Sequence, residues 1–185
     1  MIYFTSDLHF NHDRAFIYEP RGFHSIEESN KVLFDNWNST VAATDTVYML
    51  GDLFMGDDLD YVSDTLPKLN GWIHIIRGNH DTDTKMEIYR DAPNIMAIDT
   101  ARNIKLGDRH FYLSHYPTIT ANLNDNPQTA VFNLHGHIHS RQKFYEDRPY
   151  MYNVAVDAQN NRPVSLDQVM RDIDAEIEKC MSFLV

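Results

Sequence analysis

The histidines of this chain gather in short segments that also carry aspartate, asparagine and glycine. Seven of the ten histidines lie in residues 7–12, 78–81, 114–116 and 135–139, and residues 51–52 form a fifth segment of the same polar kind. Imidazoles and carboxylates are the side chains that proteins use to bind transition metals and to move protons. The clustering therefore predicts one site with metal or acid–base chemistry.

Seven side chains in these segments are candidate metal ligands. They are Asp7, His9, Asp52, Asn79, His115, His137 and His139. Three oxygen donors and four imidazoles, with no thiolate among them, suit Mn²⁺, Fe or Zn²⁺ better than Mg²⁺ or Ca²⁺, which prefer shells of oxygen alone. Seven donors are too many for one ion with open positions, whereas two ions that share a carboxylate need about that number. Paired metals are a common device for transferring a phosphoryl group to water.

Each polar segment directly follows a short apolar run that is typical of a buried strand. In the first half, expected strands at residues 2–5, 46–50 and 72–76 alternate with helical patterns at 26–41 and around 59–66. This alternation predicts a parallel sheet with crossover helices. Because ligands collect outside the carboxyl ends of such strands, we expect the segments to converge on one crevice.

The second half of the chain predicts a second sheet. Short strands are expected at residues 95–99, 102–106, 109–114, 130–134 and 150–156, and Ser165 caps a final helix that begins at Leu166. We therefore expect an α/β fold with two packed mixed β-sheets flanked by helices, a four-layer αββα sandwich. With no linker or repeat, residues 1–185 are expected to form a single domain.

The composition argues against several classes of protein. Lys and Arg total 16 against 27 Asp and Glu, so the net charge is −11, which disfavours duplex nucleic acid as a partner. The N-terminus has no basic region before its apolar residues, and the apolar runs are of strand length, so neither a signal peptide nor a membrane span is expected. The single cysteine, Cys180, favours a cytoplasmic location. The sequence leaves monomer and homodimer equally open.

The motifs SDLH, GD, GNHD, SH and GHIH, in this order from Asp7 to His139, resemble the calcineurin-like metallophosphoesterase superfamily. The segment NVAVD further on resembles a small bacterial and phage branch of it. The resemblance implies the metallophosphoesterase fold. Purple acid phosphatases have a tyrosine three residues after the bridging aspartate and protein Ser/Thr phosphatases have GDxxDRG, but here that third position is Met55, so neither group is supported.

The resemblance also implies a role for each motif residue. Asp7, His9 and His139 would hold one metal, Asn79, His115 and His137 the other, and Asp52 would bridge the two. His80 would be a catalytic histidine and not a metal ligand, while Asn79 would both bind a metal and help to take up negative charge in the reaction. The implied cofactors are two divalent transition-metal ions, with manganese preferred and iron, zinc or nickel as alternatives. The implied reaction is hydrolysis of a small phosphodiester by in-line attack of a hydroxide bridging the metals.

Several alternatives stay open at this point. A phosphomonoesterase or a nucleotide hydrolase would use the same site, a single-strand nuclease would need a basic channel, and a binding scaffold would need no His80. For the phosphodiesterase, the monoesterase and the nucleotide hydrolase the expected substrate is a small phosphate ester, with a nucleotide as one candidate. His12, Arg21 and Arg141 lie just beyond the first and last motifs and are candidates for binding it. The competing interpretation is a polar helix start for His12 and ordinary surface residues for the arginines.

Overall fold

The first sheet of the computed structural model contains the strands that precede three of the polar segments. The structure describes residues 1–122, 125–127 and 129–182. In the first sheet the strand order is β4-β3-β2-β1-β9, and the strands are β1 (Ile2–Thr5), β2 (Thr46–Met49), β3 (Trp72–Ile76), β4 (Ile95–Asp99) and β9 (Val164–Ser165). β1 to β4 run parallel, and β9 pairs antiparallel with β1.

The second sheet contains the strands that precede the other two segments. Its order is β5-β6-β7-β8, with β5 (Ala101–Leu106), β6 (Arg109–Ser114), β7 (Val131–His135) and β8 (Met151–Asn153). β5 and β6 form an antiparallel hairpin, as the Gly107-Asp108 turn predicts, whereas β6, β7 and β8 are parallel. Both sheets are mixed, so the expected arrangement of two packed mixed sheets in an α/β fold is confirmed.

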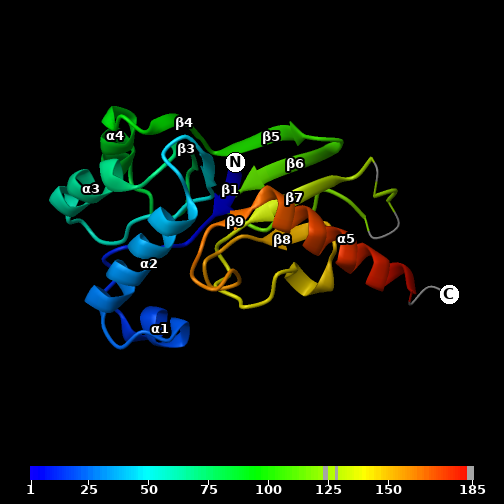
Figure 1. Cartoon of the computed structure of the whole chain (residues 1–185), viewed down its shortest axis with the longest axis horizontal. Helices are drawn as coiled ribbons and strands as arrows, with labels where there is room; N and C mark the ends of the chain where they lie inside the picture. Colours follow the sequence, from blue (N-terminus) through cyan, green and yellow to red (C-terminus); the bar gives the residue numbers. More distant parts are fainter. Residues whose placement is uncertain (123–124, 128, 183–185) are drawn as a thin grey trace.

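Helices flank the two sheets. Figure 1 shows α2 (Ile26–Thr40), α3 (Leu59–Thr65) and α4 (Asp83–Asp91) on one side of the molecule and α5 (Leu166–Ser182) on the other. The short α1 (Ala15–Tyr18) and three single-turn 3₁₀ segments, Glu19–Arg21, Leu66–Lys68 and Tyr145–Asp147, complete the helical elements of the described residues. The cap predicted at Ser165 is present, since its hydroxyl accepts from the amide of Gln168 at 3.2 Å. At the start of α2 the hydroxyl of Ser25 accepts from the amide of Glu28 at the same distance. No helix in this part of the chain has both the length and the apolar content to cross a membrane.

Two apolar clusters hold the layers together. Trp37, Ile73 and Tyr89 belong to the cluster between the first sheet and the helices α2 to α4. Phe4 and Phe132 belong to the cluster between the sheets, which α5 also joins. Because side chains alternate along a strand, the first sheet contributes residues to both clusters. Its strands are therefore packed on both faces, which holds their ends in place.

The structure corrects the expected elements in three places. The helix α4 was not predicted, and the strand expected at 150–156 ends at Asn153, since beyond it the chain crosses to the first sheet. There Ala155 bridges to Ser6, and the amide of Val156 donates to the Ser6 carbonyl at 3.1 Å. The two-residue strand β9 is too short to show a period in the sequence. The crossing after β8 matters for the site because it brings a further residue, Asp157, to the strand ends.

Candidate metal centre

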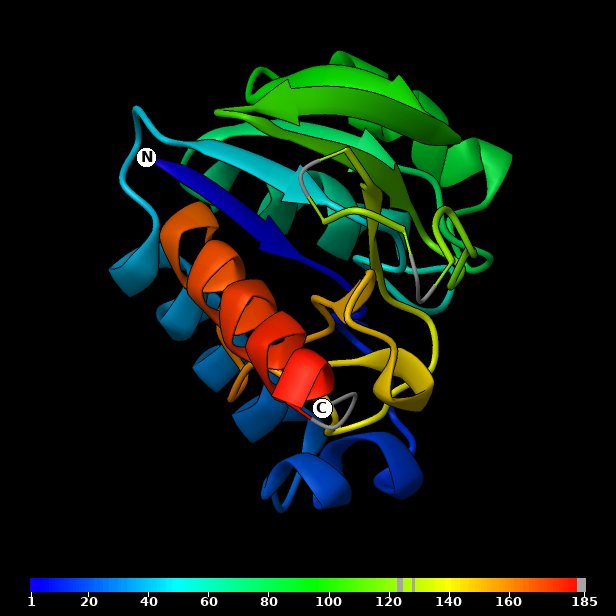
Figure 2. The same ribbon diagram turned by 90° about the vertical axis from the view of Figure 1, so that its right-hand side faces the viewer.

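The polar segments meet at the carboxyl ends of five strands, as the sequence predicts. Figure 2 shows β1 and β2 running in the same direction, toward the edge where the loops collect. Backbone hydrogen bonds then join the loops to one another. The amides of Asp7 and His9 donate to the carbonyls of Gly51 and Asp52, and the amide of Gly136 donates to His115, all at 3.0 Å.

Glycines allow these loops to approach this closely. A Cβ atom at Gly136 would lie 2.0 Å from the Ser6 hydroxyl oxygen and 2.2 Å from Oδ2 of Asp7. One at Gly78 would lie 2.2 Å from Oδ1 of Asp52. Each glycine therefore stands where a neighbouring loop presents a candidate ligand.

We expect Gly136→Ala to disturb the site more than the fold. The added methyl group would displace Asp7, so we expect weaker metal binding together with a loss of about 1–3 kcal/mol of unfolding free energy. Thermal unfolding and metal titration of the same samples would measure both effects. Gly107→Ala, at a hairpin position with open space around it, is the control, with metal binding unchanged. Equal metal affinity in Gly136→Ala and the wild type would contradict this interpretation of the packing.

Five of the seven candidate ligands have left-handed backbone conformations, which residues other than glycine seldom adopt. The φ angles are 57° at Asp7, 50° at His9, 58° at Asp52, 72° at His137 and 47° at His139. Conformations of this kind carry a free-energy cost and cluster at functional sites, where the surrounding structure enforces them. Here they occur in the loops that follow β1, β2 and β7 and that contribute these side chains to the site.

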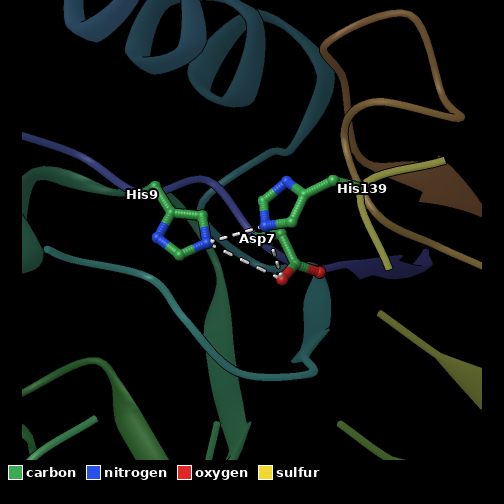
Figure 3. Close-up of side chains that lie close together, drawn as sticks. All are labelled: Asp7, His9 and His139. Atoms are coloured by element: carbon green, nitrogen blue, oxygen red, sulfur yellow. Dashed lines mark hydrogen bonds and ion pairs between the residues drawn. The ribbon is translucent and has the colours of Figure 1, made fainter. Parts of the chain in front are cut away.

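The first donor group consists of Asp7, His9 and His139, whose side chains point toward one another (Figure 3). The Nε2 atoms of the two histidines lie 3.2 Å apart, and each lies 3.8 Å from Oδ1 of Asp7. This Oδ1 is buried and takes part in no hydrogen bond within the described part of the chain. Buried polar atoms ordinarily have partners, so three converging donors with an unpartnered oxygen fit a cation.

The second donor group gathers around His115. Its Nε2 lies 2.9 Å from Oδ1 of Asn79, 3.2 Å from Nδ1 of His137 and 3.4 Å from Oδ2 of Asp52. The same Asp52 oxygen lies 3.7 Å from Nε2 of His9 in the first group. Asp52 therefore stands between the two groups, where a bridging carboxylate would have to be.

Burial and ion pairing set the protonation of the site. Burial lowers the pKa of His9 to about 2, so its imidazole is neutral and able to act as a ligand. Burial would raise the pKa of Asp52, but the hydrogen bond and charge of His115, the backbone amide of His80 and the charge of His9 together outweigh it and hold the value at about 2. For His115 burial acts to lower the pKa, and the partner carboxylates of Asp52 and Asp7 raise it to about 9. Burial raises the pKa of Asp7. A divalent cation would compensate the carboxylates of this buried cluster.

His80 lies beside the donor groups and belongs to neither. Its ring is partly exposed, 5.4 Å from the ring of His9 between centroids, and its backbone amide donates to Oδ1 of Asp52 at 2.8 Å. The buried ammonium of Lys85 donates to the carbonyls of His80 and Phe54, both at 2.9 Å. The backbone of His80 is thus fixed from two sides, while its ring is open toward solvent.

Asp81 and Tyr89 stabilise these loops from behind. The carboxylate of Asp81 accepts from the amides of Asp52 and Gly78, at 3.0 and 2.8 Å, and from the Tyr89 hydroxyl at 3.1 Å. It therefore joins the loops after β2 and β3. The side chains of Tyr89 and Lys85 come from α4, whose inward face includes that lysine, so apolar periodicity alone does not reveal the helix.

The three predicted substrate-binding residues have different surroundings. His12 lies 5.3 Å from the His9 ring, and Arg141 is exposed and donates to the carbonyl of Pro20, so both stay predictions. The role of Arg21 in substrate binding also stays a prediction. Its side chain is only 1% exposed and is held by Asp157 and by the carbonyls of Asp7 and Leu8, so its observed contacts are with the protein itself.

Comparisons with known proteins agree with the motif order. The profile of the calcineurin-like phosphoesterases matches residues 1–179, which include all five polar segments. An uncharacterized protein of Methanocaldococcus jannaschii is 34% identical over 178 residues, covering 94% of this chain and 91% of the relative. The Gene 66 protein of Mycobacterium phage L5 is 30% identical over 167 residues, covering 75% and 77% of the two chains. A crystal structure of an Aquifex aeolicus protein of unknown function matches with a TM-score of 0.68 and 25% identity, covering 95% of this chain and 98% of that one.

Proposed function

The chain belongs to the calcineurin-like phosphoesterase family, and on this basis we propose that it is a two-metal hydrolase of small phosphodiesters. The observation that carries the proposal is the position of Asp52. One of its oxygens lies 3.7 Å from His9 in the first donor group and 3.4 Å from His115 in the second. A site for a single ion would not need a carboxylate between two complete sets of donors.

The donors suit two divalent transition metals. Asp7, His9 and His139 would hold one ion, Asn79, His115 and His137 the other, and Asp52 would bind both. Bound there, the ions would supply an activated water molecule at neutral pH and positive charge for the phosphate oxygens. We propose manganese as the natural metal, because a mixed oxygen and imidazole set without thiolate suits it, with iron, zinc and nickel as competitors.

His80 is the residue of this chain that we assign to the reacting ester itself. Its partly exposed ring lies beside the donor groups, where it would donate a proton to the leaving oxygen or a hydrogen bond to a phosphoryl oxygen. Hydrogen bonds to Asp52 and Lys85 fix the backbone of His80, so the position from which its side chain extends is fixed. Asn79, the preceding residue, is exposed, and its side-chain oxygen lies 2.9 Å from Nε2 of His115.

Charge makes substrate binding dependent on the metals. The chain has a net charge of −11, and the cluster itself contains the buried carboxylates of Asp7 and Asp52, which would repel a phosphate ester. Two divalent cations would reverse the local sign of the charge.

The single cysteine, Cys180, supports a reducing cytoplasm as the compartment in which this chemistry takes place.

We favour diesters of modest size because the motif pattern resembles that of small phosphodiesterases. The test compares kcat/KM for a simple aryl phosphodiester and the matching aryl phosphomonoester, with the manganese-loaded protein. We expect the diester to be preferred and the metal-free protein to turn over neither ester. A large preference for the monoester would replace the diesterase by a monoesterase or nucleotide hydrolase with the same site.

A further inference from the structure

A buried ion pair between Arg21 and Asp157 lies directly against the first donor group. Nε of Arg21 donates to Oδ1 of Asp157 and a terminal nitrogen donates to Oδ2, both at 2.9 Å. The side chains are 1% and 9% exposed. Paired hydrogen bonds between a guanidinium and a carboxylate fix the orientation of both groups, which a lysine in place of the arginine would not do.

The pair contacts His139 and the backbone of the loop that carries Asp7 and His9. Oδ2 of Asp157 lies 3.1 Å from Nδ1 of His139. Arg21 donates to the backbone carbonyl of Asp7 at 2.7 Å and to that of Leu8, the residue between Asp7 and His9, at 3.0 Å. Within the described residues, neither side chain hydrogen-bonds to Asn79, His115 or His137 of the second group. The contacts are therefore confined to one of the two proposed metal sites.

We propose that the Arg21–Asp157 pair positions the ligands of one metal and so sets the affinity of that site alone. The carboxylate of Asp157 accepts a hydrogen bond from the protonated Nδ1 of His139, which leaves Nε2, the nitrogen that faces His9 and Asp7, as the ligand atom. The guanidinium holds the carboxylate in place and fixes the loop of Asp7 and His9. Arg21 and Asp157 are thus positioning residues, and the inference depends on the two-metal function proposed above.

The chain trace shows why this pair is specific to the site. Asp157 follows the segment that leaves β8 and joins Ser6 beyond the end of β1 through Ala155 and Val156. Arg21 comes from the 3₁₀ turn Glu19–Arg21, between the first motif and α2. Two segments 136 positions apart in sequence therefore meet behind His139. Carboxylates that hydrogen-bond to a ligand histidine fix its tautomer, and their loss weakens metal binding by about 10–100-fold.

Asp157→Asn tests this inference without any substrate. The metal-free variant and the wild type would be titrated with Mn²⁺ by calorimetry, with thermal unfolding measured on the same samples. We expect the affinity of one of the two Mn²⁺ sites to fall by about 10–100-fold, with the other site unchanged. Arg21→Lys, which keeps the charge and loses the paired hydrogen bonds, should weaken the same site by a smaller factor.

The control is Asp172→Asn. Asp172 is likewise a mostly buried carboxylate, which accepts from Lys143 at 2.8 Å and from the Tyr152 hydroxyl at 2.6 Å, and it comes from α5. We expect this variant to lose stability and to keep both Mn²⁺ affinities. Wild-type affinities in Asp157→Asn, or an equal loss at both sites, would overturn the inference while the two-metal function stands. Binding of fewer than two Mn²⁺ ions by the wild type would instead overturn the proposed function on which it rests.

Discussion

Replacing His80 by alanine is expected to lower kcat for phosphodiester hydrolysis by about 10²–10⁴-fold, with the metal content unchanged. This is the range over which a positioned acid or base accelerates a reaction. The His80 ring lies outside both donor groups, so its removal leaves every proposed ligand in place. The backbone of residue 80 would stay fixed, because Asp52 and Lys85 bind its amide and carbonyl.

Steady-state kinetics and metal analysis on the same preparation would check this result. His110→Ala is the matched control, since His110 is an exposed histidine on β6 outside every motif, and it should retain wild-type activity. Wild-type turnover in His80→Ala would remove His80 from the reaction. A loss of metal in that variant would show that His80 is a ligand, contrary to our assignment.

Asp52→Asn is expected to have a comparable effect for a different reason. The substitution removes the negative charge between the two donor groups, so we expect at least one of the two metals to be lost. Loss of a residue that only hydrogen-bonds to a metal ligand lowers activity by roughly 10–100-fold. Asp52 is itself a proposed ligand, so we expect turnover to fall by more than this. Metal analysis after gel filtration, together with kcat for the aryl diester, would measure both quantities.

Asp60→Asn, at an exposed position in the first turn of α3, is the control for the loss of one acidic charge. It should bind two metals and remain fully active. If Asp52→Asn kept two tightly bound metals and its activity, Asp52 would not bridge them. Another residue would then have to be the ligand that the two metals share.

The positions of the candidate ligands could be predicted because each follows a buried strand. Apolar runs such as Ile2–Thr5 and Trp72–Ile76 define strands, and parallel strands bring their following residues to one edge. Gly78 and Gly136 then indicate where backbones approach closely. Local patterns and one topological rule were thus sufficient to predict the meeting of residues as distant as Asp7 and His139.

The residues that hold the ligands in place could not be predicted in the same way. Arg21 and Asp157 are charged residues whose burial depends on their partner in space, and sequence alone favours an exposed surface for each. The same holds for Lys85, which is 2% exposed and donates hydrogen bonds to two backbone carbonyls. Because long-range pairs of this kind leave no periodic signal, α4 and the role of Asp157 became visible only in three dimensions.

The most direct test of the two-metal phosphoesterase is a joint measurement of metal content and turnover. The protein would be stripped with a chelator, reloaded in turn with Mn²⁺, Zn²⁺, Fe²⁺, Ni²⁺ or Mg²⁺, and assayed with an aryl phosphodiester beside its monoester. We predict two metals per chain, diester turnover that returns with Mn²⁺, and neither binding nor hydrolysis of the ester by the stripped protein. One metal per chain, or ester binding that is unchanged by chelation, would contradict the account.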